Sequence, residues 1–315
     1  MAGTGDAIIA VDHFRKTYGS QAVVEDVSFT VHRNEIFGII GPNGAGKTTT
    51  VESLIGLRER DGGTVSVLGM DPARDGYRIR ERVGVQLQEA ALPERMLVRD
   101  AFRLYASLYE RTVPWQPLAD QWGIAEKVTS PFGKLSGGQK QRLFVALALL
   151  NDPEIVILDE LSAGLDPQAR RNSWSLVRDI RAAGKTVILV SHFMDEAEAL
   201  CDRIAVIDRG RVAALDTPAN LGRSVGRQPQ VTFTAPPGFD PGRLEGRPGV
   251  DAIARVGDVV TVTGRDFLMA EVATALREQA LAPPDLRMVA ASLEDVFIRL
   301  TDHSDDEQRT EAARD

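Results

Sequence analysis

Short apolar segments and longer helical segments alternate along the first two thirds of the chain. Short, largely apolar segments at residues 35–40, 155–158 and 186–190 each lead into a polar or glycine-containing loop, which is typical of buried parallel strands. Helical patterns begin at Lys47 and again after Asp166, where a proline occupies the first turn. Strands that alternate with helices predict an α/β core with a mostly parallel sheet.

Three further strand patterns, at residues 8–11, 27–31 and 64–67, are expected to form a small antiparallel sheet beside this core. Residues 90–150 have largely helical patterns, which proline and glycine interrupt near Pro114 and at 131–133. The predicted fold class is therefore α/β, with an antiparallel β subdomain and a helical subdomain attached to the parallel core.

The composition changes near residue 220, because Gly, Pro and Arg accumulate between residues 221 and 249, as in linkers and loops. A second series of elements overlaps and follows this segment, with strands at 230–234, 252–256, 259–263 and 286–290 and helices at 267–279 and 293–300. This series predicts a small α+β domain with a ferredoxin-like order. We expect domains at residues 1–222 and 223–301, followed by a disordered acidic segment at 302–315.

Charge and composition narrow the possible functions. The formal net charge of −8 argues against a broad nucleic-acid surface, so no nucleic-acid partner is expected. The longest apolar run, residues 143–150, is far shorter than the roughly 20 residues of a membrane-spanning helix, and no secretory signal is recognisable. We expect a cytoplasmic protein whose membrane role depends on a partner. Cys201 is the only cysteine, which excludes an internal disulfide and favours a small buried side chain.

The strongest chemical motif is GPNGAGKTT, which lies between a predicted strand and a predicted helix. It comprises Gly41, Pro42, Asn43, Gly44, Ala45, Gly46, Lys47, Thr48 and Thr49. Its glycines let successive backbone N–H groups point toward phosphate oxygens, and the following helix adds its positive end. Lys47 supplies a cation for the β- and γ-phosphates, and Thr48 offers a hydroxyl to Mg²⁺. The motif predicts a nucleotide site.

A second motif, EIVILDE at residues 154–160, ends a buried strand with two adjacent carboxylates. Asp159 is placed to hold Mg²⁺ through water, and Glu160 to orient or deprotonate the attacking water. The pattern is weak alone, since many strands end in acids, but it is strong beside the phosphate-binding motif.

A third motif, LSGGQ at residues 135–139, opens an apolar helix with Ser136 as its N-cap. Its glycines expose backbone N–H groups, which give this helix start a second anion-binding surface. The candidate nucleotide contacts are Ser136, Gly137, Gly138 and Gln139. Two such surfaces in one chain indicate nucleotides that are shared between subunits.

In this order and spacing, the three motifs resemble the ABC ATPases over roughly residues 7–220. The resemblance implies that Tyr18, in KTYGS, stacks on adenine, and that His192, in LVSHF, contacts the γ-phosphate. Gln88, in VGVQLQ, would contact Mg²⁺ and sense the γ-phosphate, with Gln86 as the alternative. Residues 162–166 are similar to the D-loop, although Leu161 stands where the family usually has proline.

The resemblance further implies an ATPase that uses ATP and Mg²⁺. Lys47, Glu160 and His192 would be the catalytic residues, and Thr48, Gln88 and Asp159 would lie at the metal. Two copies would form a homodimer, packed head to tail, so that the LSGGQ segment of one copy closes over ATP held by the other. The dimer would lie on the inner face of the cell membrane beneath a separate integral-membrane permease.

The closing segment SLEDVFIRLT, at residues 292–301, resembles the daunorubicin/doxorubicin-resistance type of subunit, which implies an exporter of drugs or other hydrophobic compounds. The alternative is a soluble ABC ATPase that acts on ribosomes or another cytosolic assembly. Such chains usually carry two cassettes, whereas this chain carries one. A DNA-maintenance ATPase would need a long coiled coil between Lys47 and Leu135, where the chain leaves no room.

Overall fold

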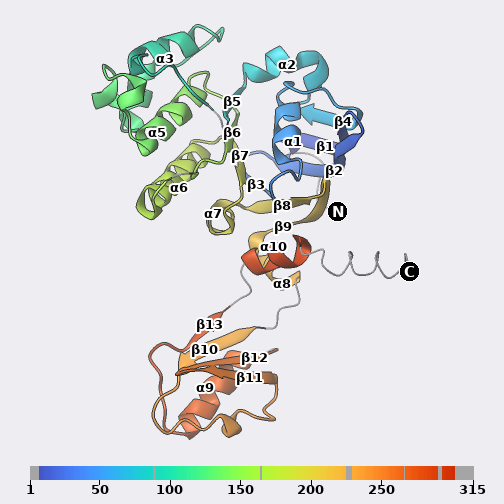
Figure 1. Ribbon diagram of the computed structural model, residues 1–315, viewed down its shortest axis with the longest axis vertical. Helices are drawn as coiled ribbons and strands as arrows, with labels where there is room; N and C mark the ends of the chain where they lie inside the picture. Colours follow the sequence, from blue (N-terminus) through green and yellow to red (C-terminus); the bar gives the residue numbers. More distant parts are fainter. Residues whose placement is uncertain are drawn as a thin grey trace. The chain divides into compact units, whose positions relative to one another are not determined.

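The computed structural model describes residues 7–87, 90–163, 165–224, 229–265, 267–289 and 293–301 (Figure 1). Contacts divide the chain into two compact units, one of Met1–Pro218 with Leu300–Asp315 and the other of Ala219–Arg299. The division at residue 218 falls a few residues before the expected domain boundary. The acidic segment 302–315, expected to be disordered, lies outside the described residues.

The larger unit is built on one sheet of the order β4-β1-β2-β9-β8-β3-β7-β6-β5. Its strands are β1 (Ala7–Tyr18), β2 (Gln21–His32), β3 (Ile36–Ile40), β4 (Gly62–Val67), β5 (Val83–Gln86), β6 (Ile155–Asp159), β7 (Thr186–Ser191), β8 (Arg203–Asp208) and β9 (Arg211–Asp216). β8, β3, β7, β6 and β5 are parallel neighbours, and β9 runs antiparallel to β8. The predicted α/β core is confirmed.

Of the predicted antiparallel strands, β1 pairs with both β2 and β4, but the three strands do not form a separate sheet. β2 pairs with β9 at Asp26 and Arg211, and this parallel pairing joins the antiparallel part to the core sheet. The backbone N–H groups of Glu25 and Asp26 donate to the carbonyl of Gly210, at 2.8 and 3.0 Å. The two parts are therefore continuous, and they share one hydrophobic core.

Every residue of β3, β6 and β7 is buried, because these strands lie inside the sheet and consist mostly of Ile, Val and Leu. Helices α6 (Pro167–Ala182) and α7 (Met194–Leu200) pack against β7, and α7 also packs against β3. α6 begins where the sequence predicts, since the Asp166 side chain accepts hydrogen bonds from the backbone N–H groups of Gln168 and Ala169 at 2.9 and 2.8 Å.

The helical part lies beside β5, at one end of the sheet (Figure 1). It contains α3 (Val98–Ala106), α4 (Trp115–Gln121) and α5 (Gly137–Ala148), with short 3-10 turns at Ala125–Lys127 and Phe132–Lys134. Pro114 and Pro131 precede two of these elements, which agrees with the predicted breaks. Helices α1 (Lys47–Leu54) and α2 (Pro72–Arg80) complete the larger unit.

The smaller unit contains an antiparallel sheet of the order β11-β12-β10-β13. Its strands are β10 (Gln230–Thr234), β11 (Val250–Val256), β12 (Val259–Gly264) and β13 (Arg287–Val289), and α9 (Leu268–Glu278) packs on β10 and β12. Helices α8 (Pro218–Ser224) and α10 (Leu293–Thr301) flank this set in the sequence. A ferredoxin-like order would place a helix after the first strand, but the chain has only a 3-10 turn there, Pro241–Arg243.

No helix in the part of the chain that the structure describes has the length and apolar character needed to cross a bilayer.

Candidate active site

The GPNGAGKTT loop connects β3 to α1, and its shape depends on glycine at two positions. A Cβ on Gly41 would lie 2.1 Å from the carbonyl oxygen of Ile207, so no larger residue fits there. Gly46 has a φ of 99°, and a Cβ at this position would lie 2.9 Å from the carbonyl oxygen of Val23. The loop is therefore packed between β8 and the start of β2.

Lys47 is 7% exposed and turns back over this loop. Its ammonium donates hydrogen bonds to the carbonyl oxygens of Gly41 and Pro42, at 2.8 and 2.9 Å. Burial lowers the pKa of Lys47, whereas the nearby carboxylates of Glu160 and Asp159 act in the opposite direction. The ammonium is thus held against the loop, and Lys47 lines one cavity with the two acids, where it can attract phosphate oxygens.

A cavity of about 320 Å³ lies over the loop. Its wall contains Val23, Asn43, Gly44, Gly46, Lys47, Thr48, Thr49, Asp159 and Glu160. Two motifs that are far apart in the sequence thus meet at one cavity. This happens because β3 and β6 both lie next to β7 and end at the same edge of the sheet.

Asp159 is 2% exposed at the end of β6. Burial and the neighbouring Glu160 raise its pKa to about 6, against the opposing effect of Lys47. Its Oδ2 atom is buried and has no hydrogen-bond partner in the described residues, and the same holds for Oε1 of Gln86. Both side chains line a second cavity together with Thr48. Carboxylate, amide and hydroxyl oxygens suit a hard cation, so these residues fit Mg²⁺.

Of the two candidate glutamines at the metal, only Gln86 lies among the described residues. Gln86 ends β5 and is 5% exposed, and its Nε2 donates to the backbone carbonyls of Leu87 and Asp159, at 2.9 and 3.2 Å. Gln88 lies outside the described residues. Its role at the metal therefore stays a prediction, while Gln86 is adjacent to the acid that the metal would need.

Glu160 and His192 meet at the ends of β6 and β7. The neighbouring strands pair Asp159 with Val190, and the Glu160 backbone N–H donates to the Val190 carbonyl at 2.9 Å. Oε1 of Glu160 lies 3.1 Å from Nδ1 of His192. The Glu160 side chain is 11% exposed, and its backbone has a positive φ of 51°. A non-glycine residue in this conformation is often found at functional sites.

The LSGGQ segment starts α5 with a capping box. The backbone N–H of Gln139 donates to Oγ of Ser136 at 3.3 Å, and that of Ser136 donates to Oε1 of Gln139 at 3.0 Å. None of Ser136, Gly137, Gly138 and Gln139 is among the residues that line the cavity over the phosphate-binding loop. Within one chain, the two predicted anion-binding surfaces are therefore not brought together.

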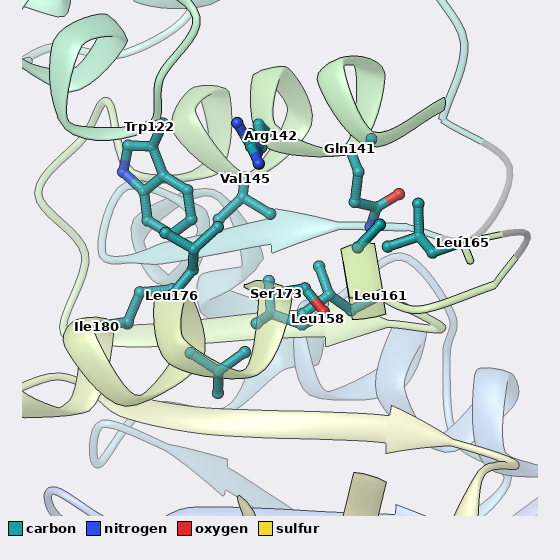
Figure 2. Close-up of a pocket in the computed structure, with 13 residues that line it drawn as sticks. Trp122, Gln141, Arg142, Val145, Leu158, Leu161, Leu165, Ser173, Leu176 and Ile180 are labelled. Carbon is teal, nitrogen blue, oxygen red and sulfur yellow. The ribbon is translucent and has the colours of Figure 1, made fainter. Parts of the chain in front are cut away.

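A small apolar cavity of about 30 Å³ separates α5 from α6 (Figure 2). Gly138 and Gln141 of α5 line it together with Leu161, Leu165 and Ser173. Leu161, at the position where the family usually has proline, is 2% exposed, so its side chain keeps apolar bulk at this boundary.

Tyr18 is 40% exposed at the turn between β1 and β2. The Lys16 ammonium and the Arg58 guanidinium each lie 5.5 Å from its ring centroid. Tyr18 does not line the cavity over the phosphate-binding loop, so its contact with adenine stays a prediction.

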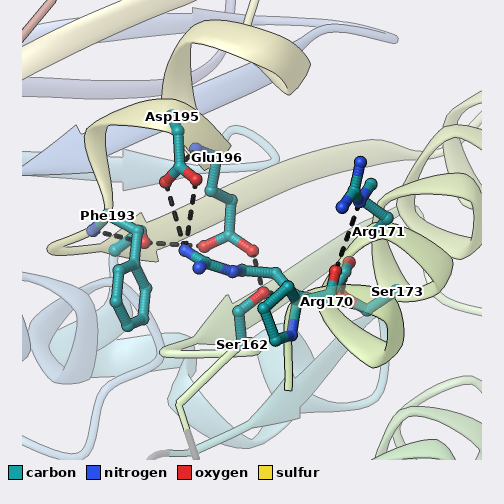
Figure 3. Close-up of polar contacts among 9 residues, drawn as sticks. Ser162, Arg170, Arg171, Ser173, Phe193, Asp195 and Glu196 are labelled. Carbon is teal, nitrogen blue, oxygen red and sulfur yellow. Dashed lines mark hydrogen bonds and ion pairs between the residues drawn. The ribbon is translucent and has the colours of Figure 1, made fainter. Parts of the chain in front are cut away.

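One polar group at this edge of the sheet was not anticipated. Glu196 of α7 is completely buried, and its carboxylate accepts hydrogen bonds from Ser162 (Figure 3) and from Ser191. Ser162 follows Glu160 by two residues, and Ser191 directly precedes His192. In the sequence, MDEAEAL has the acidic pattern of a solvent-exposed first helical turn. No sequence pattern distinguishes this glutamate from its neighbours.

A phosphate-binding loop at the carboxyl edge of a parallel sheet, next to two carboxylates, defines a P-loop ATPase. The family model described as "ABC transporter" matches residues 24–163. The chain is 36% identical over 306 residues to the Nod factor export ATP-binding protein I of Ralstonia nicotianae, and the aligned region covers 93% of this chain and 94% of that protein. It is 38% identical to the protein of the same name from Paraburkholderia xenovorans, with 94% and 97% covered.

Solved structures of ABC transporter components are also similar to this chain. One described as the ATP binding subunit of an ABC transporter has a TM-score of 0.63 and 30% identity, and the match covers 70% of this chain and 93% of that one. The cbiO1 protein from Clostridium perfringens, part of the ABC transporter complex cbiONQ, has a TM-score of 0.62 and 26% identity, with 70% and 95% covered. The chain belongs to the ABC transporter family. It is an ATP-binding subunit of such a transporter, and it hydrolyses ATP.

Proposed function

We propose that this subunit energises the export of a drug or another hydrophobic compound through a separate integral-membrane permease, at the inner face of the cell membrane. Two likenesses support export. The relatives named for Nod factor export match nearly the whole chain, including the smaller unit. Residues 292–301 resemble the drug-resistance type of subunit. Because fold alone is a poor guide to substrate, the chemical class of the cargo rests on these likenesses.

Hydrolysis would use the residues gathered at the carboxyl edge of the sheet. Lys47 and the backbone N–H groups of Gly41–Thr49 would bind the phosphates. Thr48 and Asp159 would hold Mg²⁺, together with Gln88 or Gln86. The metal, when bound, neutralises charge on the phosphate oxygens. Glu160 would orient the attacking water, and His192 would contact the γ-phosphate.

Closure would need a second copy of the chain. The capping box fixes the start of α5, and nothing lies within 4 Å of where a Cβ on Gly137 or Gly138 would be. This surface lies apart from the cavity over the phosphate-binding loop of its own chain. We infer that Ser136–Gln139 of one copy would contact ATP on the other in a head-to-tail homodimer, and that hydrolysis would reopen it.

The observation that carries the proposed hydrolytic mechanism is the 3.1 Å contact between Oε1 of Glu160, which lines the phosphate cavity, and Nδ1 of His192. The variant Glu160→Gln keeps the size of the side chain but removes the carboxylate that would orient water. We expect it to bind ATP, to dimerise with ATP in light scattering, and to hydrolyse ATP at least about 100-fold more slowly. A wild-type rate in this variant would refute the role of Glu160.

The same variant tests transport. Tagged Glu160→Gln would be recovered from detergent-solubilised cells with ATP and analysed by mass spectrometry, with Lys47→Ala as the control that binds nucleotide poorly. ATP-dependent recovery of a polytopic membrane protein would support the permease. Recovery of ribosomes, or of no membrane protein, would leave the ATPase standing and refute the proposed role in transport.

A further inference from the structure

Glu196 is completely buried, which is unusual for a carboxylate side chain. It lies in the first turn of α7 and has no exposed surface. Removing a carboxylate from water is strongly unfavourable unless hydrogen bonds replace its hydration. Here its Oε1 accepts from the hydroxyl of Ser162, and its Oε2 accepts from the hydroxyl of Ser191 at 2.6 Å (Figure 3).

The two serines belong to two different segments of the active site. Ser162 follows Glu160 by two residues, and Ser191 directly precedes His192. Both are buried, with exposures of 1% and 0%. Oγ of Ser191 also accepts from the backbone N–H of Phe193 at 3.0 Å, which fixes the turn that carries His192. Glu196 therefore connects the segment after β6 to the segment after β7.

The neighbouring contacts hold the same two segments. Oγ of Ser162 lies 3.4 Å from Oγ of Ser173 on α6. Arg170, also on α6, pairs with Asp195 on α7 at 3.2 Å, and its guanidinium lies 4.8 Å from the ring centroid of Phe193. Figure 3 shows these side chains gathered between α6 and the turn before α7. The helix that follows the D-loop segment and the helix that follows His192 are thus joined at one place.

We propose that Glu196 is a positioning residue for ATP hydrolysis: by holding Ser162 and Ser191 together, it keeps Glu160 and His192 at the distance at which they act. Both partners are hydroxyls, and each has a single hydrogen, which it gives to Glu196. A movement of either segment would therefore break a buried hydrogen bond. This inference rests on the proposed roles of Glu160 and His192.

The variant Glu196→Gln is a sharp test because it keeps the volume and removes only one acceptor. The glutamine carbonyl oxygen still accepts, but its NH2 group can only donate, so one serine would have to turn its hydroxyl away or lose its partner. Glu198→Gln, an exposed change two residues further along α7, is the matched control. We expect Glu196→Gln to lower kcat about tenfold or more, with KM for MgATP and the melting temperature nearly unchanged, because displacements of about 1 Å can reduce rates about 100-fold.

A spectroscopic measurement separates positioning from a merely structural effect. The chain has four histidines, so the Cε1–H resonances are few, and that of His192 can be assigned with His192→Ala. Glu196→Gln should move this resonance, and Glu198→Gln should not. An unchanged kcat, or a lower kcat without movement of the His192 resonance, would overturn the proposal.

If Glu196→Gln does not fold, the variants Ser162→Ala and Ser191→Ala take its place in both assays, because each removes one of the two hydrogen bonds to Glu196. Either serine variant should then reproduce the loss of kcat and the shift of the resonance, and normal behaviour of both would overturn the proposal. Full activity of Glu160→Gln would instead show that the proposed function itself is wrong, whatever Glu196 does.

Discussion

Asp159 is predicted to destabilise the folded chain when no cation is bound. Its pKa is raised from 3.8 to about 6, so at pH 5 the folded chain retains a proton that the unfolded chain has largely lost. Stability therefore falls as pH rises from about 4 to 6, and the reduced stability persists above that range. One pKa unit corresponds to about 1.4 kcal/mol, so ionised Asp159 lowers the free energy of unfolding by roughly 3 kcal/mol at pH 8.

The variant Asp159→Asn removes this charge with little change in shape. In urea unfolding without Mg²⁺ or nucleotide, we expect it to be more stable than the wild type by roughly 2–3 kcal/mol at pH 8, while its Mg²⁺-dependent ATPase activity is lost. The advantage should be smaller at pH 5 by about 1 kcal/mol or more. Asp120→Asn, at an exposed position, is the control and should show neither effect.

Two results would refute this reasoning. Lower stability of Asp159→Asn than of the wild type at pH 8 would mean that the carboxylate is stabilised by its surroundings. An equal stability advantage of the variant at pH 5 and pH 8 would mean that the titration of Asp159 does not cause this advantage. Mg²⁺ with ATP should stabilise the wild type more than the variant, since the cation binds the ionised form.

Three further predictions concern other parts of the chain. Gly46→Ala should weaken binding of a fluorescent ATP analogue at least about tenfold, because a Cβ would meet a backbone oxygen at 2.9 Å; Gly44→Ala, where φ is also positive but nothing lies within 4 Å, should have a smaller effect. Phe233→Ala should lower the urea stability of the smaller unit by roughly 3–5 kcal/mol, since this buried ring packs edge-on against Phe239, and an unchanged midpoint would contradict the packing. Burial raises the pKa of Cys201, so its thiol should react with a disulfide reagent only after urea unfolding, and rapid labelling of the native chain would disprove this.

The fold could be predicted where the sequence pattern is continuous. The strands at 155–158 and 186–190 were placed within one residue of β6 and β7, because buried parallel strands are apolar throughout. β5 was not predicted, since its four residues include Gly84 and Gln86 and resemble a loop. Gly84 is needed there, as a Cβ would lie 1.8 Å from the carbonyl oxygen of Ala148 in α5. The pattern of apolar and polar residues along the sequence does not reveal such a close approach of helix and strand.

The candidate site could be predicted where its residues are neighbours in the sequence. Lys47, Asp159 and Glu160 belong to contiguous motifs, and the topology of a parallel sheet brings the two motifs to one cavity. Glu196 could not be found, because its burial depends on how α7 packs against β7 and on two serines from other segments. The catalytic roles of these residues stay predictions, as does the role of Gln88.

The packing of the phosphate-binding loop has a consequence for the thermodynamics of nucleotide binding. Gly41 lies against the carbonyl of Ile207, Gly46 lies against that of Val23, and the carbonyl of Ala45 accepts from the Gly210 backbone N–H at 3.2 Å. The loop is thus held in shape by strands on both sides, and its conformational entropy is lost when the chain folds, not when phosphate arrives. Affinity for ATP then depends on β2 and on the hairpin of β8 and β9, although most of their residues never touch the nucleotide. A substitution that loosens their pairing would appear in a binding assay as a less favourable entropy.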